Sequence, residues 1–126
     1  MDPVLKTSVL DNAYVKLHSK SQGYRFEGTD AASKITCLSG DSATFDFSPF
    51  RNGVDLFFID GSHSYEYVRS DTFSALKCCH PGSVIVWHDF GRFRVDGVTR
   101  WLLEFSKKGH NIYAIPDTSL ALMIVR

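Results

Sequence analysis

The sequence has 126 residues, of which 44% are hydrophobic and 22% charged, and its formal net charge is zero. This composition is typical of a single globular domain with one modest core, and the balanced charge argues against a protein that binds nucleic acid through a basic surface. No apolar run reaches the length of a transmembrane helix, and the first residues lack the pattern of a signal peptide. We therefore expect a cytoplasmic protein with no nucleic-acid partner and no membrane partner.

The first 53 residues predict one helix and one strand, and Tyr24–Gly28 could be a further short strand or an extended loop. Apolar side chains between Val4 and Ser19 recur at helical spacing, which predicts an amphipathic helix. Lys34–Ser39 is a candidate strand that stops at Gly40-Asp41-Ser42. The aromatic-rich segment 43–50 contains a proline near its end, so we expect a short helical turn or a loop there.

The centre of the chain predicts a strand, a helix and a second strand. Val54–Asp60 and Ser83–Trp87 are short apolar runs, which is typical of strands buried on both faces of a parallel sheet. Between them, apolar side chains from Tyr65 to Cys79 recur on one helical face, and Ser62 or Ser64 could cap the start of that helix. The usual handedness rule makes this a right-handed βαβ unit.

The remaining elements follow from breakers and spacing. Pro81-Gly82 is expected to end the central helix. Apolar residues from Val95 to Phe105 predict the next helix, which Lys107, Lys108 and Gly109 would close. Segments 111–115 and 120–125 read as two strands, and their short connection requires an antiparallel hairpin.

Four side chains that can bind a metal follow the two central strands: Asp60, His63, His88 and Asp89. The carboxyl ends of neighbouring parallel strands meet at one edge of a sheet, where ligands bind, so Asp60 and Asp89 should lie roughly 5–10 Å apart. Carboxylates favour Mg²⁺ or Ca²⁺, whereas an imidazole ligand favours Mn²⁺, Fe²⁺ or Zn²⁺. Each residue also has a plainer interpretation, because an acid at a strand end is often a helix cap and a single histidine is often a surface residue.

These segments together resemble the second half of a class I S-adenosylmethionine-dependent methyltransferase, over roughly residues 34–126. The similarity rests on Gly40-Asp41-Ser42, on Asp55–Tyr65 with its FIDGSHSY sequence, on Asp71 and on Pro81–Asp89. It is greatest to the metal-dependent O-methyltransferase branch that includes the macrolide-sugar enzymes. The resemblance implies a truncated Rossmann-like α/β fold. Its sheet would be mostly parallel with a C-terminal antiparallel hairpin, and helices would cover both faces.

The resemblance also implies roles for individual residues. Asp60, His88 and Asp89 would bind a divalent metal, Mg²⁺ or Mn²⁺, and His63 matches a histidine that acts as general base in some relatives. Gly40-Asp41-Ser42 falls where relatives contact S-adenosylmethionine. The metal would lower the pKa of a hydroxyl on a small acceptor molecule, and a neutral imidazole could accept its proton before methyl transfer.

The chain departs from this family at its N-terminal side. The family's first strand and glycine-rich loop should precede the similar region, yet no G-x-G occurs in the sequence. We therefore expect one truncated domain over residues 1–126, in which residues 1–33 form a helix and linker and residues 34–126 form the core. Such a protein would be inactive alone or dependent on a partner. The missing strand would also leave Val54–Asp60 with an open apolar edge, so we expect a homodimer or a partner chain to cover it.

Two other functions stay open. The first is a non-catalytic binding or structural module on a methyltransferase-derived fold. The second is a small metal-dependent enzyme of another class, hydrolytic or oxygenase-type, that would use the same acids and histidines. The fold alone does not choose among these functions.

Overall fold

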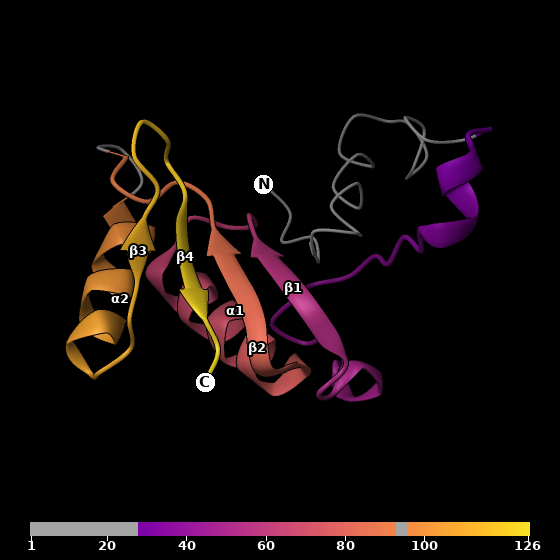
Figure 1. Ribbon diagram of the computed structural model, residues 1–126, viewed down its shortest axis with the longest axis horizontal. Helices are drawn as coiled ribbons and strands as arrows, with labels where there is room; N and C mark the ends of the chain where they lie inside the picture. The colour runs from indigo at the N-terminus through magenta and orange to yellow at the C-terminus, as the bar shows by residue number, and fades with distance from the viewer. Residues whose placement is uncertain (1–27, 93–95) are drawn as a thin grey trace.

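The computed structural model describes residues 28–92 and 96–126, so the helix predicted at residues 4–19 lies outside the described residues (Figure 1). The described elements are η2 (Asp30–Lys34), η3 (Ser48–Phe50), β1 (Val54–Ile59), α1 (Tyr65–Cys78), β2 (Cys79–Trp87), α2 (Asp96–Lys107), β3 (Tyr113–Ala114) and β4 (Ala121–Ile124). Neither α-helix in these ranges has the length and hydrophobicity needed to cross a lipid bilayer.

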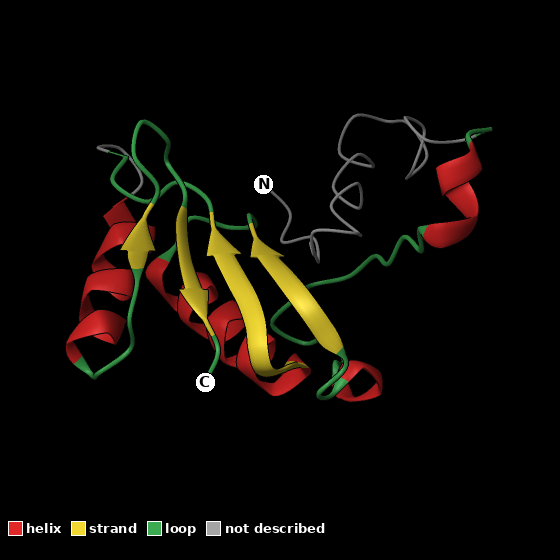
Figure 2. Ribbon diagram, in the orientation of Figure 1, coloured by secondary structure: helices red, strands yellow, loops and turns green. Residues whose placement is uncertain are grey.

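The strands form a single four-stranded sheet in the order β1-β2-β4-β3, drawn in yellow in Figure 2. β1 and β2 are parallel and α1 connects them, which confirms the predicted βαβ unit. β4 lies antiparallel to both β2 and β3, which confirms the C-terminal hairpin. The α/β fold class is therefore confirmed. Among the described strands, parallel pairing is limited to β1 and β2.

The two α-helices pack against each other and cover the same face of the sheet, behind the strands in Figure 1. Within the described ranges, the expectation of helices on both faces is therefore met on one face only. The reason lies in the strand order. β2 is parallel to β1, and β3 is parallel to β2, so a crossover connection joins each of these pairs. Both crossovers lead in the same direction across the sheet. Right-handed crossovers in one direction place their helices on one face.

The core lies between this face and the helices. Alternate residues of the strands point into it, as expected from the two-residue period of a strand; they are Phe57, Ile59, Ile85, Trp87, Ala121 and Met123. Thr72 of α1 joins three elements there, because its Oγ1 accepts hydrogen bonds from Nε1 of Trp87 and Nε1 of Trp101, each at 3.0 Å. The same hydroxyl donates to the carbonyl of Val68 at 2.7 Å. This cluster fixes the end of β2 against both helices.

One predicted strand is wrong. Residues 35–39 form no strand, and the five residues before them form the 3₁₀ helix η2. A short apolar run becomes a strand only when a partner edge is available, since strand preference depends mostly on cross-strand packing. Among the described strands β1 therefore pairs on one side only, with β2, and stands at the edge of the sheet.

The boundaries of α1 agree with the prediction at one end only. Ser64 caps the helix, because its Oγ accepts a hydrogen bond from the backbone N of Tyr67 at 3.3 Å. The helix ends at Cys78, and β2 begins at the next residue, so Pro81-Gly82 lies inside β2 and does not end the helix. An irregularity in the pairing with β1 accommodates these two exposed residues.

Candidate functional site

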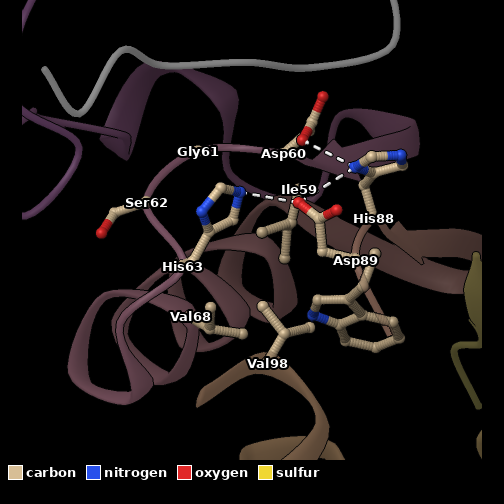
Figure 3. Close-up of a pocket in the computed structure, with 10 residues that line it drawn as sticks. Ile59, Asp60, Gly61, Ser62, His63, Val68, His88, Asp89 and Val98 are labelled. Carbon is tan, nitrogen blue, oxygen red and sulfur yellow. Dashed lines mark ion pairs between the residues drawn. The ribbon is translucent and has the colours of Figure 1, made fainter. Parts of the chain in front are cut away.

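The carboxyl ends of β1 and β2 bring all four predicted side chains, Asp60, His63, His88 and Asp89, to one small cavity (Figure 3). The backbone N of His88 donates to the carbonyl of Ile59 at 3.0 Å, so the two strand ends are held together beyond the last ladder pair. The cavity has a volume of about 10 Å³. It is therefore large enough for one water molecule or one ion.

Asp60, His88 and Asp89 form a set that could hold a metal ion. One ligand atom from each lies within 4.8 Å of the other two. Nδ1 of His88 is 3.2 Å from Oδ1 of Asp60 and 3.1 Å from Oδ2 of Asp89. Despite these short distances, this buried nitrogen forms no hydrogen bond of acceptable geometry. A buried polar atom without a partner is costly, and a cation between the three ligand atoms would satisfy it.

The other ring nitrogen of His88 is fixed from the neighbouring hairpin. Nε2 lies 3.2 Å from Oγ of Ser119, in the connection between β3 and β4. The backbone N of Phe90 also donates to the carbonyl of Ser119 at 2.9 Å. A histidine that ligates a metal usually has its second nitrogen hydrogen-bonded in this way, which orients the ring.

Asp89 is the most buried acid of the cluster and contacts three side chains. It is 5% exposed, and its Oδ2 lies 2.7 Å from Nε2 of His63 as well as near His88. Nε of Arg92 lies 3.4 Å from Oδ1. The backbone of Asp89 has a φ of 69°, a left-handed conformation that aspartate tolerates better than most residues. This sharp turn immediately after β2 directs the carboxylate into the cluster.

His63 is placed between the cluster and solvent. Its side chain is 42% exposed, and Figure 3 shows one ring nitrogen directed at Asp89. When Nε2 carries the proton that faces Asp89, Nδ1 has a free lone pair and can accept a proton. The geometry is thus compatible with the role of general base.

Gly97 positions the loop that carries His63, and sequence reasoning missed it. A Cβ at residue 97 would lie 2.4 Å from the carbonyl oxygen of His63 and 2.7 Å from the backbone N of Tyr65. The first turn of α2 therefore packs directly on this loop, at a distance that only glycine permits. The one signal in the sequence was a glycine inside the first turn of a predicted helix.

Gly40-Asp41-Ser42, the predicted cofactor-binding turn, does not line this cavity. Both carboxylate oxygens of Asp41 accept from the hydroxyl of Tyr67 at 2.9 Å. Ser42 is buried and hydrogen-bonds to Asp71 of α1, whose pKa burial raises to about 6. The Ser42 hydrogen bond lowers that pKa and the charge of Asp41 raises it, but burial is the larger effect. The turn is thus attached to α1, and its role in binding a cofactor stays a prediction.

A family model described as a methyltransferase domain matches residues 7–90. Because the match covers more than half of the chain, the protein belongs to this methyltransferase family. The match includes all four cluster residues, and it begins well before residue 34, where the sequence resemblance was placed. No match was found among curated proteins or among solved structures.

Proposed function

We propose that this chain is a metal-dependent O-methyltransferase domain that activates a hydroxyl of a small acceptor molecule. Asp60, His88 and Asp89 would hold Mg²⁺ or Mn²⁺, and His63 would accept the proton of the acceptor. The observation that supports this best is Nδ1 of His88, which is buried between two carboxylates without a suitable hydrogen bond.

A divalent cation bound there would lower the pKa of an acceptor hydroxyl. The protein's own residues do the rest. Asp89 holds Nε2 of His63 at 2.7 Å, which leaves Nδ1 of the imidazole as the proton acceptor. Ser119 orients the ring of His88. Gly97 keeps the His63 loop against α2, so that the base stays at a fixed distance from the acids.

S-adenosylmethionine, which the family uses in general, would supply an electrophilic methyl group. In this chain Gly40-Asp41-Ser42 is the candidate contact for its adenosine part. The sequence contains no G-x-G turn for close approach of backbone to the donor. We therefore propose that donor binding depends on a partner chain.

We also propose that a second copy of the chain covers the open edge of the sheet. Within the described ranges β1 is an edge strand, and the face of the sheet away from α1 and α2 carries partly exposed apolar residues, among them Val84, Val86 and Ile124. Sedimentation velocity tests this directly. The expected mass is twice 14.2 kDa. A protein that stays monomeric even at the concentrations used for crystallisation would contradict the proposal.

Calorimetric titration with Mn²⁺ and Mg²⁺ tests the metal site. We expect one ion per chain and a loss of binding in His88→Ala. His80→Ala is the matched control, because His80 also pairs with an acid, at the opposite end of β1. A wild-type protein that takes up neither ion at millimolar concentration would overturn the proposal. Titration with S-adenosylhomocysteine in the presence of the bound ion then tests the donor site separately.

A further inference from the structure

A second cleft lies between α1 and the segment 42–51, and none of the four cluster residues lines it. Its volume is about 490 Å³, which lies within the usual range for pockets that bind small molecules. The cleft has fixed walls. The backbone N of Asn52 donates to the carbonyl of Lys77 at 3.3 Å, and the ring of Phe47 packs on that of Phe57 in the core with centroids 6.2 Å apart.

The charge around this cleft is strongly positive for a chain with no net charge. Arg51, Arg69 and Lys77 line it and are exposed. Among the described residues, none of these three cations has a carboxylate within ion-pair distance. The one acid of the lining, Asp46, accepts a hydrogen bond from the backbone N of Ser48 at 3.0 Å, in the turn of its own segment. The lining therefore carries three cations and one acid, so its charge is positive.

The remaining lining combines aromatic rings with hydroxyl groups. Phe45, Phe47 and Phe73 supply ring surfaces, and Ser70 and Ser74 supply hydroxyls from one face of α1. The guanidinium of Arg69 lies over the ring of Phe73, 5.1 Å from its centroid. This stacking holds the guanidinium in place while its N–H groups remain able to donate to an anion.

We propose that this cleft binds a small phosphate-bearing molecule with a planar ring system, of the size of a mononucleotide. The cations and serine hydroxyls match a phosphate group, and the phenylalanine rings match the base. S-adenosylmethionine itself is a poor complement, since its sulfonium is positive. Ser42 of the candidate donor turn also lines this cleft, but the ligand proposed here differs from the donor, and its binding does not depend on the metal site.

Calorimetric titration of the full chain with AMP, adenosine and inorganic phosphate tests the ligand class. We expect AMP to bind at least about tenfold more tightly than either fragment, because only AMP uses both the cations and the rings. We also expect this affinity to fall as salt is raised, since the cations are exposed. Equal affinity for all three probes would overturn the proposal. A single-stranded oligonucleotide that binds more tightly per molecule than AMP would overturn it in favour of a nucleic-acid surface.

Two variants locate the binding. Lys77→Gln should weaken AMP about fivefold, the loss expected for one screened charge contact, and Arg69→Gln should weaken it further because it also removes a ring contact. Lys107→Gln is the matched control, because Lys107 lies in the last turn of α2 as Lys77 lies in the last turn of α1, and both are exposed. Arg69 packs over the buried ring of Trp101, so circular dichroism should accompany its titration. Unchanged AMP affinity in Lys77→Gln would contradict the assignment, whatever the stability of Arg69→Gln.

Discussion

The strands β1 and β2 carry a histidine–aspartate pair at each end. At the carboxyl ends, His63 and Asp89 lie 2.7 Å apart, and at the amino ends His80 and Asp55 lie 2.6 Å apart. The pairs differ in their surroundings. The Asp89 side chain is 8% exposed and the Asp55 side chain is 89% exposed. Asp89 also contacts His88 and Arg92, whereas Asp55 has only His80 as a charged partner among the described residues.

A short distance between a histidine and an acid is therefore a poor criterion for a functional site. An exposed histidine–aspartate pair contributes little to stability, and its polar atoms do not require a ligand. The carboxyl-end cluster differs because His88 Nδ1 is buried there without a proper hydrogen bond, and because three ligand atoms converge on one small space. The two ends of the strands thus differ in the burial of their polar atoms and in the convergence of their ligand atoms. Both differences can be tested.

The largest expected effect is a loss of stability from a change in the core beneath the carboxyl ends of β1 and β2. Thr72→Val would leave two buried indole N–H groups, of Trp87 and Trp101, without an acceptor, which should cost about 4 kcal/mol of unfolding free energy. Trp87 immediately precedes His88, so metal affinity should fall as well. Urea denaturation measures the loss. Thr72→Ser keeps the hydroxyl and is the control; a serine variant as unstable as the valine variant would show that the methyl, and not the hydrogen bonds, matters.

The second largest effect should distinguish Asp89, in the carboxyl-end cluster, from Asp55, at the amino ends of the strands. Asp89→Asn removes a carboxylate that contacts both His63 and His88, while asparagine tolerates the φ of 69° at this position. We expect the affinity for Mn²⁺ to fall at least about 100-fold. Asp55→Asn, the same change at the exposed end, should leave Mn²⁺ binding unaltered. Calorimetry on both variants compares the ends, and equal losses would show that the cluster is not the metal site.

The pH dependence of stability should come from Asp71, a buried acid in the middle of α1. Its pKa rises from 3.8 to about 6 because of burial, so the folded state binds the proton more tightly than the unfolded state. Stability is therefore greatest below pH 4 as far as this group is concerned, and it falls as pH rises from about 4 to above 6. The loss should be about 2 kcal/mol after allowance for its residual contact with water.

Asp71→Asn tests this, because an amide cannot ionise. The variant should be more stable than the wild type at pH 7 and should lack the decline between pH 4 and 6. Asp117→Asn is the control, since Asp117 is exposed in a turn, and it should keep the decline. Thermal unfolding at a series of pH values gives the curves; a wild-type profile that rises over this interval would contradict the assignment.

The sequence predicted the carboxyl-end cluster well for a simple reason. Each acid and histidine directly follows an apolar run, so once the strands are placed as parallel neighbours the side chains must meet. The predicted strand at 34–39 failed because its membership of the sheet depends on a partner that the local pattern does not contain. Gly97 was missed because its contact with the His63 carbonyl depends on how α2 packs.

The amino-end pair was unpredictable for a related reason. Asp55 meets His80 because the register of β1 and β2 shifts after the pair of Val54 and Cys79, with Leu56 next pairing to Val84. A regular ladder would have placed different residues side by side, since a change of register moves every side chain. Interactions that depend on a bulge cannot be derived from periodicity alone.

The smallest expected effect lies at this amino end. The hydrogen bond that His80 donates to the Asp55 carboxylate, and then its hydrogen bond to the carbonyl of Pro81, raise the pKa of His80 above 6.5. The pair therefore stabilises the fold while His80 is protonated, and this contribution is lost as pH rises through the raised pKa. Asp55→Asn should lower the pKa of His80 toward 6.5, which NMR titration of the ring protons can measure, with almost no change in stability because the pair is exposed. Asp117→Asn should leave that pKa unchanged. A large fall in stability or in Mn²⁺ affinity in Asp55→Asn would mean that the two ends of the strands are coupled through β1. Burial would then no longer explain why only the carboxyl end forms a cluster fit for a metal.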